Sequence, residues 1–115
     1  MFILLIKSNK NRADLLTKRI HKILGKNLKN KKISFLGVTF KPNTDDMRES
    51  ASLKMIPYLC KKGAKVSYFD PSGIKKEFLN FKNCLYKKNI EEILSKSDLI
   101  ILLTEWDEFN SIVFI

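Results

Sequence analysis

Charged side chains gather in residues 38–49, between an apolar run and the next helix-forming stretch. The segment contains Lys41 and Arg48, whose cationic groups can bind phosphate oxygens. The helix expected after it would add backbone N–H groups, which also favour anions. The segment is about twice as long as most connections between a strand and a helix. These features predict an anion-binding loop.

The same loop allows a second interpretation. Asp45, Asp46 and Glu49 could neutralise the two cations within the loop itself. It would then be an ordinary solvated surface, on which exposed ion pairs contribute little to stability. Residue types and spacing favour neither interpretation over the other.

Other side chains that could take part in catalysis or metal binding have simpler explanations. Residues 104–109 hold the only tryptophan, and we interpret them as an aromatic lid on the sheet with a helix start at Asp107. Cys60 and Cys84 lack the neighbours that activate a thiolate, which indicates buried structural cysteines. His21 is expected on a solvated helix face. With one histidine and these cysteine spacings, we expect no metal site.

Apolar periodicity and turn residues predict the elements that position these side chains. Strands and helices alternate, which predicts an α/β fold: a Rossmann-like open, mostly parallel sheet with flanking helices. The strand at 98–103 has five consecutive apolar residues and is expected at the centre. Strands are expected at 33–37, 65–69, 84–86 and 98–103, and helices at 12–24, from Ser50 to just before Gly63, at 74–80 and at 89–96.

The first predicted strand lacks a dinucleotide fingerprint. Only Gly37 is present, and Thr39 and Pro42 stand where the other glycines of G-x-G-x-x-G would be. The domain is therefore not expected to bind NAD in the usual way. Asp70, at the end of the second of these strands, is better explained as a turn former before Pro71 than as a ribose ligand.

The net charge of +10 over 115 residues is unevenly distributed. Residues 1–32 carry ten basic residues against one acid, whereas residues 33–115 carry twelve against eleven. Nineteen of the 22 basic residues are lysine, and base-edge recognition relies on arginine. We expect no nucleic-acid partner; the alternative, binding through residues 7–32, predicts a steep dependence on salt.

Apolar residues 2–6 are too few for a signal peptide or a membrane span. We therefore expect a cytoplasmic chain with no membrane partner. The apolar end, residues 111–115, has no cap or polar tail after it, which suggests an element cut off or altered. An incomplete sheet would expose a strand edge, so poor solubility or self-association is expected.

Residues 35–50, FLGVTFKPNTDDMRES, closely resemble the C-terminal domain of the UDP-glucose 6-dehydrogenase family. Further matches follow in the family's order: KGAKV at 62–66, FDP at 69–71 and LTEWDEF at 103–109. The resemblance covers about residues 12–110. Dehydrogenases of GDP-mannose and of N-acetylated UDP-sugars share much of the pattern, but the residues of these motifs are most similar to those of the UDP-glucose branch.

The resemblance implies an NAD-dependent oxidoreductase that converts UDP-glucose to UDP-glucuronate, a polysaccharide precursor. The family transfers two hydrides through a thiohemiacetal and a thioester on a catalytic cysteine, and its C-terminal domain supplies the UDP-sugar side of the cleft. Matching positions assign Phe40 and Lys41 to substrate contact and Arg48 to NAD. The NAD-binding domain and the segment with the catalytic cysteine have no counterpart here, so no catalytic residue is expected.

The resemblance also suggests a division of the chain. Residues 1–32 form an N-terminal basic segment with a remnant of the interdomain linker helix, and residues 33–115 form a UDP-sugar-binding domain incomplete at its end. We expect a fragment that is inactive alone. The alternatives are a dehydrogenase of a related nucleotide sugar, or a non-catalytic module that complements a separately encoded N-terminal half. A homo-oligomer is a further possible assembly.

Overall fold

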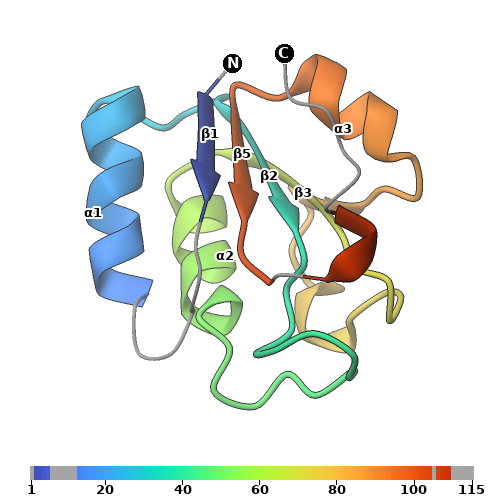
Figure 1. The fold of residues 1–115 in the computed structure, drawn as a ribbon. Helices are drawn as coiled ribbons and strands as arrows, with labels where there is room; N and C mark the ends of the chain where they lie inside the picture. The colour runs from blue at the N-terminus through green and yellow to red at the C-terminus, as the bar shows by residue number, and fades with distance from the viewer. Residues whose placement is uncertain (1, 6–12, 105, 110–115) are drawn as a thin grey trace.

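A five-stranded, all-parallel sheet forms the centre of the computed structural model, which describes residues 2–5, 13–104 and 106–109. The strand order is β1-β5-β2-β3-β4, so β5 lies inside the sheet, as expected of its apolar run (Figure 1). The predicted α/β, Rossmann-like class is confirmed. The strands are β1 (Phe2–Leu5), β2 (Lys32–Leu36), β3 (Lys65–Phe69), β4 (Cys84–Tyr86) and β5 (Leu99–Leu102).

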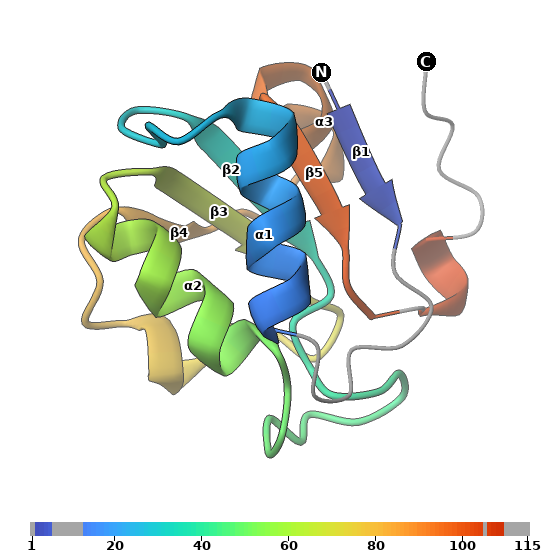
Figure 2. The ribbon, with the colours of Figure 1, turned by 90° about the vertical axis from the view of Figure 1, so that its left-hand side faces the viewer.

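Helices cover the sheet on both faces. The helices α1 (Ala13–Leu24) and α2 (Ser52–Lys61) lie side by side on one face, and α3 (Ile90–Lys96) lies on the other (Figure 2). Apolar residues spaced four apart explain α1, since Leu16 and Ile20 both face the core. Two short 3₁₀ helices, η1 (Lys76–Phe78) and η2 (Asp107–Phe109), complete the described elements.

The buried apolar side chains form two clusters, one on each face of the sheet. Beneath α1 and α2, Phe35 and Tyr68 are among the largest fully buried side chains, and the Tyr68 ring meets the edge of Phe78 at 5.4 Å between centroids. Beneath α3, the cluster is smaller and includes Ile93 and Phe109. The described part of residues 1–32 contributes to the larger cluster, so α1 shares a core with the rest of the sheet.

One sequence expectation about helices holds in part and another is wrong. The cap position of α2 is Ala51, which makes no side-chain hydrogen bond, but the Ser50 hydroxyl accepts the backbone amide of Ser52 at 3.2 Å, as expected of a capping serine, and also donates to the Val38 carbonyl at 2.6 Å. The helix expected at 74–80 is only the 3₁₀ turn η1.

The strand β1 was not expected from sequence. Its register with β5 pairs Phe2 with Leu99 and Leu5 with Leu102. The strand β1 therefore covers one edge of β5, and the edges of the described sheet are β1 and β4. The expected end element at 111–115 lies outside the described residues. Among the residues that the structure describes, no helix is long and apolar enough to cross a membrane.

Candidate functional site

The long loop of residues 37–50 leaves the carboxyl end of β2, the edge where open parallel sheets bind ligands (Figure 1). Gly37 begins it with φ of +82°, and a Cβ there would lie 2.7 Å from Thr104 Cβ. Only glycine fits this position, because the backbones after β2 and β5 approach too closely for a side chain.

Asp70, at the end of β3, holds the first turn of the loop. Its carboxylate is fully buried and accepts hydrogen bonds from the backbone amides of Val38 at 2.8 Å and Thr39 at 3.3 Å. The other carboxylate oxygen accepts from Ser72, whose hydroxyl in turn accepts from the buried Lys75. Asp70 therefore stabilises the loop from the neighbouring strand, a role that its Asp-Pro turn context did not suggest.

The loop is also fixed by hydroxyl groups from two other elements. Thr104, just after β5, donates from Oγ1 to the Thr39 carbonyl at 2.5 Å. Ser50 and Ser52 each donate to the Val38 carbonyl at 2.6 Å, which ties the end of the loop to its beginning. Hydroxyls at the ends of two elements gave no distinct signal in the sequence, so these contacts were missed.

The predicted substrate residues lie on the free part of this loop. Phe40 is half-buried, and its amide donates to the Asp46 carbonyl at 3.3 Å. Lys41 is exposed, and among the described residues its ammonium has no ion-pair partner. An accessible cation on a loop with fixed ends can meet an anionic ligand without first breaking an ion pair.

Arg48, the predicted cofactor residue, is held by a single acid. Its Nε donates to Asp46 Oδ1 at 3.0 Å and its Nη2 to Oδ2 at 2.9 Å, with 88% of its side chain exposed. These bonds from Arg48 lower the pKa of Asp46 from 3.8 to about 2. The loop thus fits the ion-paired interpretation at Arg48 and the anion-binding interpretation at Lys41. The two cations do not share an acid as their ion-pair partner.

The start of the loop does not suit a dinucleotide. In the usual fingerprint, backbone amides after the first strand face the pyrophosphate, but here the amides of Val38 and Thr39 are taken by Asp70. Asp70 is itself buried beneath the loop and is not available to a ribose. A complete NAD site is therefore not built from these residues.

The remaining candidates agree in part with expectation. The 3₁₀ turn η2 begins at Asp107, and Trp106 packs with Phe109 on the α3-side core, as expected of an aromatic lid; Glu105 lies outside the described residues. His21 is not simply solvated, because its Nε2 lies 2.7 Å from the Tyr58 hydroxyl and links α1 to α2.

The two cysteines are buried and free of disulfide, as predicted. Their thiols contact each other, and this contact together with burial raises the pKa of Cys84 far above its usual value. Such a thiol is a poor nucleophile, which fits a structural role. Within the described ranges, no group of three or more His, Cys, Asp or Glu side chains could hold a metal ion.

Comparison with protein families decides where the chain belongs. Residues 34–114 match the model described as "UDP-glucose/GDP-mannose dehydrogenase family, UDP binding domain". The chain belongs to this family. The matched range begins within β2 and includes the whole loop of residues 37–50.

Curated members of the family are similar over most of this chain. UDP-glucose 6-dehydrogenase of Rickettsia bellii is 39% identical over 109 residues, which is 93% of this chain and 25% of that protein. The enzyme of Rhizobium meliloti is 32% identical over 106 residues, 92% of this chain and 24% of its own length. The chain thus spans about a quarter of the length of these family members.

Solved structures of the family share the fold. A UDP-glucose dehydrogenase from Pyrobaculum islandicum superimposes with a TM-score of 0.78 and 26% identity, over 90% of this chain and 24% of that one. A GDP-mannose dehydrogenase from Pseudomonas aeruginosa gives a TM-score of 0.64 and 25% identity, over 84% and 24%. These similarities cover the UDP-binding domain and leave most of each enzyme unmatched.

Proposed function

We propose that this chain is the nucleotide-sugar-binding part of a UDP-glucose 6-dehydrogenase and has no dehydrogenase activity alone. Phe40 and Lys41 contact the UDP-sugar, with the Lys41 ammonium on its phosphate or sugar oxygens. The observation that carries this proposal is the geometry of the loop of residues 37–50: buried bonds from Asp70 and Thr104 fix its start, and Lys41 stays exposed without an ion-pair partner among the described residues.

The proposed role for NAD follows from the same loop. The chain does not form the pyrophosphate-binding turn itself, so NAD would be held mainly by another domain. Arg48 then contacts the cofactor from across the cleft, with its guanidinium oriented by Asp46. NAD accepts hydride in the family's reaction; this chain contributes the binding and orientation of the groups around it.

Titration calorimetry with UDP-glucose tests the proposal directly. Wild-type chain is expected to bind, and Lys41→Ala to weaken binding about tenfold or more, because a hydrogen bond to a charged group is worth roughly 1.5–3 kcal/mol. Lys61→Ala is the matched control, since Lys61 is also exposed but lies in the last turn of α2. Equal affinities for wild type and Lys41→Ala would refute the assignment.

Two further measurements define the substrate and the activity. Titration with GDP-mannose and with an N-acetylated UDP-sugar distinguishes the UDP-glucose branch from its relatives, and we expect UDP-glucose to bind best. The purified chain mixed with UDP-glucose and NAD should produce no NADH. Reduction of NAD by this chain without any other protein would contradict the proposal.

A further inference from the structure

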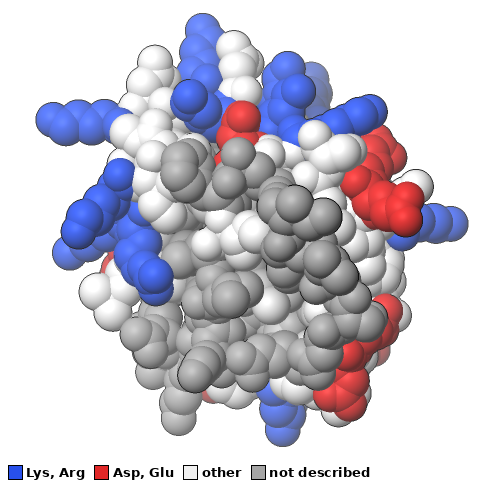
Figure 3. All heavy atoms as spheres, turned by 45° about the horizontal axis from the view of Figure 1, so that its top comes forward, with Lys and Arg blue, Asp and Glu red and all other residues white. Residues whose placement is uncertain are grey.

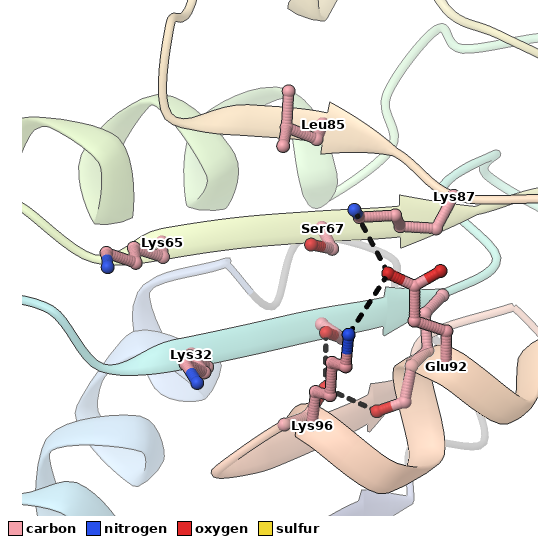
Figure 4. Close-up of a pocket in the computed structure, with 10 residues that line it drawn as sticks. Lys32, Lys65, Ser67, Leu85, Lys87, Glu92 and Lys96 are labelled. Atoms are coloured by element: carbon pink, nitrogen blue, oxygen red, sulfur yellow. Dashed lines mark hydrogen bonds and ion pairs between the residues drawn. The ribbon is translucent and has the colours of Figure 1, made fainter.

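A groove lies on the α3 face of the sheet, and no residue of the loop 37–50 lines it. This groove has a volume of about 230 Å³ and runs along β3 between β2, β4 and α3. Its polar lining comes mainly from lysine and serine side chains, and Figure 4 shows Lys87 and Lys96 at the Glu92 carboxylate, with Lys32 and Lys65 away from it. The lysines and serines of the lining are Lys32, Lys65, Lys87, Lys96, Ser34, Ser67 and Ser97.

The groove exists because this part of the sheet has no covering helix. The connection between β3 and β4 packs its η1 turn, with Phe78, against the α2 side of the sheet. The opposite face of β3 and β4 is left to α3 alone. Parallel sheets normally bury apolar side chains on both faces, yet here Ser67 is half-buried and Leu85 is 54% exposed.

Positive charge in the groove exceeds what its own acid can neutralise. Glu92 Oε1 forms ion pairs with Lys87 Nζ, at 3.4 Å, and with Lys96 Nζ, at 3.8 Å. Lys32 and Lys65 begin neighbouring strands and are register partners, and neither ammonium has an ion-pair partner among the described residues.

A further acid, Asp98, lies beside this end of the groove. The Asp98 carboxylate accepts the backbone amide of Lys32 at 2.8 Å, but it is not part of the groove lining. Two adjacent like charges without a counter-ion would be stabilised by an anion placed between them.

Hydroxyl groups line the floor of the groove beside these ammonium groups. Ser97 donates to the Ile93 carbonyl at 2.6 Å, so in its 2.6 Å contact with Ser34 it is Ser34 that donates. The Ser67 hydroxyl makes no hydrogen bond within the part of the chain that the structure describes, and it is therefore available to a ligand. Ammonium and hydroxyl donors together are typical of phosphate-binding sites.

The surface around the groove would also attract an anionic ligand. Lysine and arginine side chains gather along the upper rim of the molecule, at the amino ends of the strands (Figure 3). The end of α2 and the connections that lead into β2 and β3 carry these additional lysines: Lys26, Lys29, Lys31, Lys61 and Lys62. A surface of one sign raises the local concentration of small ions of the opposite sign.

We propose that this groove binds a small molecule with two or more phosphate groups, with Lys32 and Lys65 as its main ligands and Ser67 as a hydroxyl donor. The volume is several times the roughly 30 Å³ that a water molecule occupies, so more than one phosphate group fits. The site is separate from the proposed nucleotide-sugar loop and goes beyond it.

Titration with inorganic pyrophosphate, followed by calorimetry and by amide chemical shifts, tests this site. The double variant Lys32→Gln/Lys65→Gln is expected to weaken binding about tenfold or more, because two charged contacts are lost. Lys61→Gln/Lys62→Gln removes the same charge outside the groove and should change affinity less than twofold. Circular dichroism of both double variants confirms that each is folded.

The outcomes separate this site from the nucleotide-sugar loop. Pyrophosphate should shift the amide signals of the groove residues Lys32, Lys65 and Ser67 in wild type and equally in Lys41→Ala; shifts confined to residues 37–50 would overturn the proposal in favour of the loop. Equal losses in the two double variants would also overturn it, since binding would then reflect diffuse surface charge. Absence of binding at millimolar pyrophosphate would overturn it outright.

Discussion

Arg48 binds the carboxylate of Asp46, two residues earlier in the chain, through both Nε and Nη2. The backbone amide of Arg48 donates to the same carboxylate at 2.9 Å. A planar guanidinium fixed in this way is already oriented before any ligand arrives. A ligand for Arg48 must therefore use the guanidinium edge that Asp46 leaves free.

The Arg48–Asp46 contact predicts a specific pH dependence. Because the Asp46 pKa is lower in the folded state, about 2, than its usual 3.8, the contact stabilises the fold fully above pH 3.8 and loses this effect as pH falls through 2. Arg48→Gln should return the pKa of Asp46 toward 3.8, measured by NMR titration of the carboxyl carbon. Lys41→Gln, which removes a weaker influence, should shift this pKa less; a larger shift than that of Arg48→Gln would contradict the assignment.

Asp70 should be important for the stability of the whole domain. Asp70→Ala leaves the amides of Val38 and Thr39 without their acceptor, and a buried unsatisfied donor costs about 1–3 kcal/mol. We expect the free energy of unfolding in urea to fall by about 3 kcal/mol. Asp45→Ala, on the exposed part of the same loop, should change it by less than about 0.5 kcal/mol. Similar values for the two variants would show that Asp70 does not hold the loop.

Two glycines with similar backbone angles should respond differently to alanine. Gly25 has φ of +94° with no atom near its added Cβ, whereas at Gly37 the Cβ would collide with Thr104. Gly25→Ala carries only backbone strain, about 1–2 kcal/mol, and Gly37→Ala adds overpacking of about 1–3 kcal/mol. Thermal unfolding should therefore show a clearly larger loss for Gly37→Ala, and equal losses would mean that the backbones can separate.

The strand β1 should protect β5 from association. Deletion of residues 2–5 would leave the backbone groups of β5 without a partner on one side, and exposed edge strands promote pairing between molecules. We expect a lower melting temperature and a larger apparent mass in size-exclusion chromatography than for the full chain. A deletion variant that melts and migrates like the full chain would show that β1 contributes little.

The Cys84 thiol should be protected in the folded chain. Its contact with Cys60 and its burial raise the Cys84 pKa and so disfavour the thiolate, the form that reacts with alkylating reagents. Iodoacetamide at pH 8 should modify Cys84 slowly in the native chain and rapidly in the urea-unfolded chain, as followed by mass spectrometry of the peptide that contains it. Rapid modification of Cys84 in the native chain would contradict this prediction.

The sequence predicted the elements best where local signals were strong. Strands β3 and β4 match their predicted bounds, because β3 ends at an Asp-Pro turn and apolar residues mark β4. Ser50 was placed as a helix cap on local grounds, and its hydroxyl accepts the Ser52 amide, but its second bond, to a carbonyl twelve residues away, was missed. Asp70 was missed as a support of the loop for the same reason, because its partners lie 31 and 32 residues earlier.

Long-range pairing also explains why β1 was missed. Four strand residues without a turn signal are indistinguishable from a loose apolar end until their partner is known. The composition of the loop of residues 37–50 identified Lys41 and Arg48 as candidate ligands for an anion. Which of the two pairs with an acid of the loop depends on how the loop is folded. Sequence spacing alone does not contain that information.

The pairing of β1 with β5 has a consequence for how the chain folds as it is made. Phe2 is translated before its partner Leu99, and almost all the other described elements are translated between them. Pairing across such a separation closes a long loop at an entropic cost, and sheets that depend on it fold slowly. The apolar strand β1 must therefore wait for its partner while those elements are synthesised, which leaves it open to a chaperone during that interval.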